Sequence, residues 1–218
     1  GENAPFVRLL YDYLYGEGAK VNKAEIIASL KSVISNTEYK NILFIDSAGN
    51  VKGFYPNQDT VLGDHMLQRF PEFIKLKAGV LTDLHRTSRV SYNHLDLVIP
   101  LFAMWSDNPE PFGLLTIRID PQETFYPLVQ TWPIPGKTAE SLLIRQEGDK
   151  VLYLNELRFR KNSEMELLKS VSEEKLPAAM AIRGIETTTD GRDYRGRPVV
   201  AAMKKVPGSP WYLVAKAD

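Results

Sequence analysis

The spacing of hydrophobic residues changes once along the chain, near residue 40. Before that point the spacing is helical, with one stretch formed by Phe6, Leu9, Leu10, Tyr13 and Leu14 and a second by Ile26, Ile27, Leu30, Val33 and Ile34. Asn22, followed three residues later by Glu25, is a capping-box pattern for the second stretch. Gly16 and Gly18 interrupt the pattern, so one long kinked helix and two shorter helices both fit.

Beyond this point the alternation typical of β-strands takes over. Residues 41–46 and 51–55 flank a turn sequence at 47–50 and predict a hairpin. A helix is predicted over residues 61–76, kinked or broken at Pro71, followed by three strands over 79–86, 92–103 and 112–119. Asp120, Pro121 and Glu123 form a helix-start pattern, which predicts a helix running toward Trp132.

The same landmarks return roughly one hundred residues later, which indicates a duplicated module. Residues 45–49 match 144–148, and the pattern from Pro111 to Asp120 is echoed from Pro210 to Asp218. The second half also carries a helical segment at 174–183 and a strand at 197–206. We therefore predict an α+β fold with a long N-terminal helical segment (1–38) and two tandem modules (39–132 and 133–218), each with an antiparallel sheet flanked by helices.

Composition narrows the class of protein. The chain has 218 residues, of which 44% are hydrophobic and 25% charged, as is ordinary for a soluble globular protein. Lys and Arg together equal Asp and Glu at 27 each, so no net field attracts nucleic acid, and we expect no nucleic-acid partner. The chain has no cysteine, which excludes disulfides and thiolate chemistry.

Two runs in the second half carry a resemblance to a known family. They are Asp-Tyr-Arg-Gly-Arg-Pro-Val-Val-Ala-Ala at 193–202 and Val-Pro-Gly-Ser-Pro-Trp-Tyr-Leu-Val-Ala-Lys at 206–216. Both resemble the end of the membrane-proximal module of double-Cache (PAS-like) sensor domains. Residues 142–145, 151–156 and 176–182 are similar to the same half of that family, and residues 83–86 and 94–98 are similar to the distal half of one subset.

The resemblance implies a periplasmic or extracellular sensor region of a membrane receptor rather than an enzyme. Such regions precede histidine kinase, diguanylate cyclase or chemoreceptor output domains and are flanked by transmembrane helices. The distal module of the family holds a small molecule, and no cofactor is implied. Asp218, as the counterpart of Asp120, would cap a helix beyond the last residue, and we expect that helix to lead into a membrane. A free periplasmic ligand-binding or adhesive protein without an output domain is the alternative.

Alternation along residues 92–98 places candidate ligand contacts on one face of a strand. Tyr92, His94 and Asp96 share that face, and Asp83 and His85 share a face of the preceding strand. If the two strands form a hairpin, these polar faces become neighbours. Buried charges and imidazoles need partners or a ligand, whereas a solvated sheet face needs neither, and both readings stay open.

Three further residues complete the candidate set. In the amino-acid-binding branch of the family, an acidic residue near the end of this strand holds the ligand's ammonium group, whereas this chain has Arg118 there. An arginine favours a carboxylate-bearing ligand. Lys216 at the matching place in the repeat instead favours a structural or solvated cation. Tyr55 and Trp105 would either form apolar walls of a ligand pocket or pack in the protein core.

Catalytic and metal motifs are missing from the sequence. There is no nucleophile elbow, paired-histidine metalloprotease motif or phosphate-binding glycine loop. Asp83, His85, His94 and Asp96 have donor types that suit zinc, but no local spacing supports a metal site, and we expect none. His65 lies on a predicted helix with no obvious partner. The apolar face of the N-terminal helical segment would either form a dimer interface or pack on the protein's own sheets.

Overall fold

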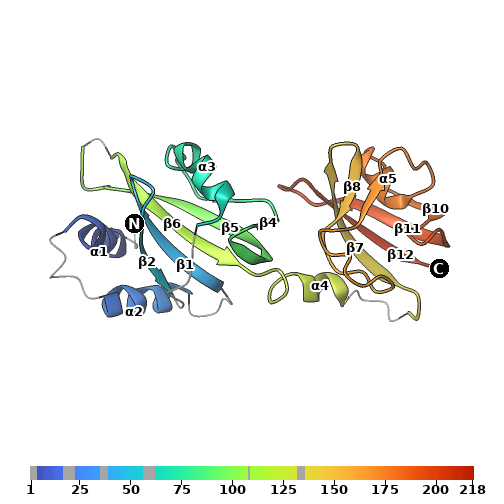
Figure 1. The fold of residues 1–218 in the computed structure, drawn as a ribbon, viewed down its shortest axis with the longest axis horizontal. Helices are drawn as coiled ribbons and strands as arrows, with labels where there is room; N and C mark the ends of the chain where they lie inside the picture. Colours follow the sequence, from blue (N-terminus) through green and yellow to red (C-terminus); the bar gives the residue numbers. More distant parts are fainter. Residues whose placement is uncertain (1–3, 17–22, 35–38, 56–61, 108, 132–135) are drawn as a thin grey trace. The chain divides into compact units, whose positions relative to one another are not determined.

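The computed structural model describes residues 4–16, 23–34, 39–55, 62–107, 109–131 and 136–218. The chain divides into two compact units, Gly1–Pro121 and Gln122–Asp218, called here the first and second unit. Each unit is built on one antiparallel sheet with helices beside it, so the predicted α+β class is confirmed (Figure 1). Within the described ranges, no helix is long and apolar enough to cross a membrane.

The sheet of the first unit has the strand order β2-β1-β6-β5-β3, and β4 also pairs with β5. Its strands are β1 (Tyr39–Asp46), β2 (Val51–Tyr55), β3 (Val80–Leu81), β4 (His85–Thr87), β5 (Val90–Phe102) and β6 (Pro111–Ile119). The long strand β5 pairs with β6 along most of its length and with the β3 and β4 segments on its other edge. Side chains from this strand therefore reach both faces of the sheet.

Helices cover both faces of this sheet (Figure 1). Helices α1 (Ala4–Tyr15) and α2 (Lys23–Ile34) pack on the face that carries Ile42, Phe44 and Leu101. Helix α3 (Asp64–Phe73) packs on the opposite face, with Leu43, Ile45 and Val98. Since successive residues of a strand point to opposite faces, the two clusters follow from the period of two in the sequence.

The N-terminal segment contains two twelve-residue helices, with residues 17–22 outside the described ranges, and the predicted cap Asn22 lies among them. The helix predicted over 61–76 is α3, and Pro71 lies inside it.

The predicted helix start at Asp120 is wrong. Residues 121–125 form turns, and α4 (Tyr126–Gln130) begins after Phe125 with a proline in its first turn. Tyr126 is buried and its hydroxyl donates to the carbonyl of Leu154, so tertiary packing rather than the local capping pattern sets where this helix begins. The predicted end near Trp132 lies outside the described residues.

The sheet of the second unit has the order β10-β11-β12-β7-β8-β9. Its elements are β7 (Glu140–Glu147), β8 (Lys150–Tyr153), β9 (Leu168–Ser170), α5 (Pro177–Ile182), β10 (Thr188–Arg192), β11 (Pro198–Lys205) and β12 (Trp211–Ala217). Read from β8 to β10, this order has the same connectivity as β2-β1-β6-β5-β3 in the first unit. Strand β12 therefore holds the place in its sheet that β6 holds in the first.

Candidate functional site: a buried histidine and aspartate cluster

The hairpin of β4 and β5 brings together polar residues that the sequence only placed on separate strands. His85 lies directly opposite His94, and Thr87 lies opposite Val90. Asp96 follows His94 by two residues and therefore points to the same face of β5. On the other face Leu97, Ile99 and Leu101 pack toward α1 and α2, so the predicted alternation of this strand is confirmed.

Asp96 and Arg118 form a buried ion pair across β5 and β6. The two residues are register partners, and Arg118 Nε lies 3.1 Å from Asp96 Oδ1. Both side chains are at most 1% exposed. Thr82 fixes the backbone of Asp96: its Oγ1 accepts from the Asp96 N–H at 2.8 Å, and its own N–H donates to the Asp96 carbonyl at 2.9 Å. The carboxylate is therefore held in one place, with Oδ1 committed to the guanidinium group.

His65 joins the cluster from the first turn of α3, although no partner for it was predicted from the sequence. Its ring centroid lies 3.6 Å from that of His85, and its Nε2 lies 3.6 Å from Asp96 Oδ2. Asp64, the preceding residue, accepts a hydrogen bond from Ser88 Oγ at 2.7 Å and pairs with Arg89 at 2.9 Å. These contacts attach the start of α3 to the turn between β4 and β5. The available signal was that all three histidines of the chain fall in the first unit.

The four side chains converge on one point. Nε2 of His85 and Nε2 of His94 lie 3.9 and 3.8 Å from Asp96 Oδ2. One ligand atom from each of the three histidines and Asp96 lies within 4.8 Å of the others. Among the residues that the structure describes, these Nε2 atoms and Asp96 Oδ2 are buried without a hydrogen-bond partner. Buried polar atoms normally have one, so this set calls for an explanation.

The orientation of two imidazoles is fixed by backbone carbonyls. His85 Nδ1 lies 2.7 Å from the carbonyl oxygen of Asp83, and His94 Nδ1 lies 3.0 Å from that of Tyr92. A carbonyl can only accept, so each Nδ1 carries the proton in these bonds and each Nε2 presents its lone pair to the cluster.

Burial also keeps the three imidazoles neutral. Desolvation lowers the pKa of His65 to about 4, helped by the charges of neighbouring His85 and His94 and of Arg118 and opposed by Asp96. Desolvation lowers the pKa of His94 to about 3 and lowers that of His85 as well. Burial disfavours the charged form of histidine, so all three rings are uncharged at neutral pH.

The other predicted residues fall in two places. Asp83 lies beside the cluster, where its carboxylate accepts from the N–H of Leu84 at 2.7 Å. The Tyr92 ring lies 5.7 Å from that of His94. Tyr55 and Trp105 are on the side of α1 and α2: Tyr55 packs on that cluster, and Trp105 stacks edge-on with Tyr11. The structure does not bring these two aromatic residues to the polar cluster.

In the second unit, the buried charged side chains around Lys216 pair with one another. Lys216, at the place of Arg118, lies 3.0 Å from Glu140 and 2.9 Å from Asp193. The Tyr194 hydroxyl donates to Glu140 at 3.0 Å. Arg195 pairs with the same Asp193. The prediction that Lys216 is a structural cation is thus supported, because its ammonium group is paired with two buried carboxylates.

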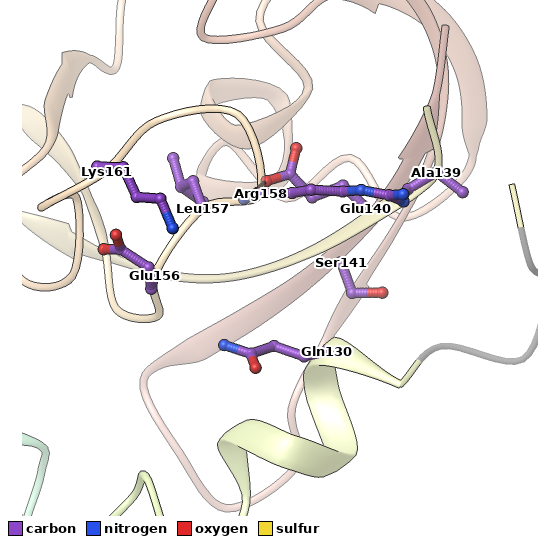
Figure 2. Close-up of a pocket in the computed structure, with 8 residues that line it drawn as sticks. All are labelled: Gln130, Ala139, Glu140, Ser141, Glu156, Leu157, Arg158 and Lys161. Carbon is purple, nitrogen blue, oxygen red and sulfur yellow. Dashed lines mark hydrogen bonds between the residues drawn. The ribbon is translucent and has the colours of Figure 1, made fainter. Parts of the chain in front are cut away.

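A cavity of about 290 Å³ lies next to this network (Figure 2). Its lining is Gln130, Ala139, Glu140, Ser141, Glu156, Leu157, Arg158 and Lys161. Glu156 accepts from the backbone N–H groups of Asn162 and Ser163, and Arg158 donates to two backbone carbonyls. These two charged side chains are thus engaged with the backbone of the second unit itself, so we place the candidate ligand site at the first-unit cluster instead.

Comparison with known proteins gives the fold. No protein-family model matches the chain, and neither does any curated protein. Among solved structures, an extracellular ligand-binding receptor from Desulfohalobium retbaense is 13% identical, with a TM-score of 0.57 over 100% of this chain and 37% of its own. The ligand-binding domain of the Pseudomonas aeruginosa amino-acid chemoreceptor PctB, in complex with L-Arg, is 14% identical, with a TM-score of 0.56 over 100% and 86%. The extracellular domain of a putative histidine kinase is 13% identical, with a TM-score of 0.56 over 98% and 86%.

The chain therefore has the same fold as these extracellular and ligand-binding domains, which agrees with its sequence resemblance to double-Cache domains. It spans about a third of the length of the Desulfohalobium receptor. All three similar structures are described as ligand-binding or extracellular domains of receptors and a kinase.

Proposed function

We propose that the chain is the extracytoplasmic sensing region of a transmembrane receptor of the histidine kinase, diguanylate cyclase or chemoreceptor type, with no catalytic activity of its own. The observation that carries this proposal is the likeness to extracellular receptor domains over 98–100% of the chain, which includes both units. On this proposal residues 1–38 are an N-terminal helical segment, 39–132 a membrane-distal module and 133–218 a membrane-proximal one. Membrane attachment through flanking helices and dimerisation through the N-terminal helices belong to the same proposal.

The distal module is the proposed sensing module, and its ligand is a small molecule. The candidate contacts are the cluster residues His85, His94, Asp96 and Arg118 and the adjoining Asp83 and Tyr92; Tyr55 and Trp105, which the sequence also suggested, lie on the α1 and α2 side of the sheet and are left out. Small-molecule sites rely on a few precisely placed polar groups to fix a ligand's orientation, and the cluster supplies such groups in the first unit. The second unit supports this choice by contrast, because its buried charges already have partners.

A carboxylate-bearing ligand is the class to test first. Arg118 is the cation at this place in the sheet, and guanidinium groups bind carboxylates in a bidentate manner. Asp96 already contacts this guanidinium group, so an incoming carboxylate would share Arg118 with Asp96.

Thermal unfolding of the purified chain with matched pairs of small organic acids and their amides tests both parts. A ligand at roughly 100 times its Kd adds about 2.7 kcal/mol to the free energy of unfolding, which raises the melting temperature. We expect an acid to do this while its amide does not, and we expect Arg118→Lys, which keeps the charge but loses the bidentate guanidinium group, to weaken the shift. The exposed Lys204→Ala in the second unit is the matched control.

Two results would count against the proposal. If no acid, amide, amino acid or amine changes the melting temperature, small-molecule sensing is wrong. If the coding sequence that flanks these 218 residues encodes no apolar segment of about 20 residues, the receptor part is wrong and the free periplasmic alternative stands.

A further inference from the structure

We propose that His65, His85, His94 and Asp96 form a tetrahedral site for a divalent transition-metal ion, with zinc as the best match. This inference goes beyond the sensing role and does not depend on it, because a metal site can stabilise a domain that senses nothing. It also revises the expectation from the sequence, which had no local spacing for a metal site and left His65 without a partner.

The first argument is the spacing of the donor atoms. Ligands about 2.0–2.1 Å from a tetrahedral zinc ion are separated from one another by roughly 3.3 Å. Asp96 Oδ2 lies 3.6, 3.9 and 3.8 Å from the three histidine Nε2 atoms. Small side-chain rotations would bring all four atoms to the bonding distance.

The second argument is the kind of donor. The cluster presents imidazole lone pairs and one carboxylate oxygen, the ligand set that suits zinc and its neighbours rather than magnesium or calcium, which prefer oxygen ligands. An ammonium group could also meet four acceptors. However, hydrogen bonds of about 2.9 Å would hold those acceptors roughly 4.7 Å apart. The three distances to Asp96 are closer to the metal value.

The third argument is the support around the donors. The carbonyls of Asp83 and Tyr92 accept from Nδ1 of His85 and His94, an arrangement that histidine ligands of metals nearly always show. Arg118 holds Asp96 through Oδ1, and Oδ2, which has no hydrogen-bond partner among the described residues, lies close to the imidazoles. Each of these three donors is therefore oriented before any ion enters.

The fourth argument is the cost of an empty cluster. His94 and Asp96 are fully buried, and the Nε2 and Oδ2 atoms have no hydrogen-bond partner among the described residues. A single water molecule has two protons to donate and cannot satisfy Nε2 of His85, Nε2 of His94 and Asp96 Oδ2 together. A divalent ion meets all four at once.

The test is zinc binding to the purified full chain after stripping with a chelator. We expect one zinc ion per chain by mass spectrometry after dialysis, and no retention of magnesium under the same conditions. In His65→Ala, we expect zinc affinity to fall by roughly 100-fold or more, since the loss of supporting residues alone costs 10–100-fold. His65 is 22% exposed, the most accessible of the four side chains, so this variant is the one best suited to fold. Gln68→Ala, an exposed change on the same helix, is the matched control and should bind zinc as the unchanged chain does.

A second measurement needs no variant. Cobalt(II) in a tetrahedral site of nitrogen and oxygen ligands has a characteristic visible absorption, which we expect to appear on addition of one equivalent and to vanish when zinc displaces it. Retention of no zinc by the unchanged chain, or equal zinc affinity in the unchanged chain and in folded His65→Ala, would overturn the proposal. Zinc and the organic ligand would share His85, His94 and Asp96, so the acid screen is run on the chelator-stripped chain, where failure of one proposal can be told from failure of the other.

Discussion

The two units share one strand order but treat their central buried cation differently. In the second unit Lys216 meets two carboxylates, Glu140 and Asp193, and Tyr194 donates to the first of them. In the first unit Arg118 meets Asp96, and that carboxylate faces three imidazoles, of which His85 and His94 direct their Nε2 lone pairs at the cluster. The cation of the second unit is thus surrounded by carboxylates that it can pair with, whereas in the first unit several acceptors face one point.

The difference separates a structural network from a binding site on chemical grounds. A network that satisfies its own members rigidifies the core and has no atoms left for a ligand. A cluster with several buried acceptors aimed inward is costly by itself and becomes favourable when a cation enters. Four predictions test this contrast, from the largest expected effect to the smallest.

Breaking the second-unit network should cost most. Lys216→Met removes the cation between Glu140 and Asp193 and leaves two buried carboxylates close together. Removal of one partner from a buried ion pair costs about 3–5 kcal/mol in the free energy of unfolding. Urea unfolding measures this change, with Lys204→Met as the control. That lysine is 79% exposed, and its loss should change stability by less than about 0.5 kcal/mol. Equal effects of the two variants would contradict the structural assignment.

Zinc should stabilise one unit only. At a free zinc concentration of roughly 100 times the Kd, the expected gain in the free energy of unfolding is about 2.7 kcal/mol. Hydrogen exchange followed by mass spectrometry should show slower exchange in β4, β5 and the start of α3. It should show no change in β11 and β12. Protection in both units would mean that zinc acts elsewhere.

Acid should weaken the second unit through Asp193. Burial alone would raise the pKa of this carboxyl group, but hydrogen bonds from Arg195 and Lys216 lower it below the ordinary value of 3.8. The unfolded chain therefore takes up the proton first as the pH falls, and the stability that Asp193 contributes above that value is lost as the pH falls through the folded-state pKa. Asp193→Asn should remove this part of the pH dependence. Unfolding curves between about pH 5 and pH 2 would show it as a flatter profile. An unchanged slope would rule out Asp193 as the source.

The smallest effect is expected at Gly63, which precedes α3. A methyl group there would lie 3.0 Å from Thr87 Cγ2 and 3.1 Å from His65 Nδ1, tighter than ordinary contacts. Gly63→Ala should therefore displace His65 slightly and weaken zinc binding by less than about tenfold, since the ligand itself remains. Gly79→Ala is the matched control, because its new methyl group would be in ordinary contact, 3.4 Å from Ile99. A loss as large as that of His65→Ala would mean that the helix start is disrupted rather than shifted.

The parts of the site that depend on local structure could be predicted from the sequence, and the parts that depend on tertiary contacts could not. The faces of β5 follow from the period of two, and the pairing of His85 with His94 follows from a hairpin between neighbouring strands. His65 reaches the cluster through the docking of α3 on that hairpin by Asp64, which no spacing along the chain records. The pairing of Asp96 with Arg118 depends on the register between β5 and β6.

The predicted helix start at Asp120 failed for the same kind of reason. The capping pattern there is a local preference, and the burial of Tyr126 in the second unit overrides it.

Strand β5 also has a mechanical consequence, because it belongs to two surfaces at once. Asp96 on one face and Leu97 on the other share a single peptide plane, whose atoms move as a rigid group. Leu97 packs on the cluster that supports α1 and α2. A movement of the Asp96 backbone would therefore be passed directly to Leu97 and to the face on which α1 and α2 pack. A single layer of backbone thus separates the polar cluster on one face of the sheet from the two N-terminal helices on the other.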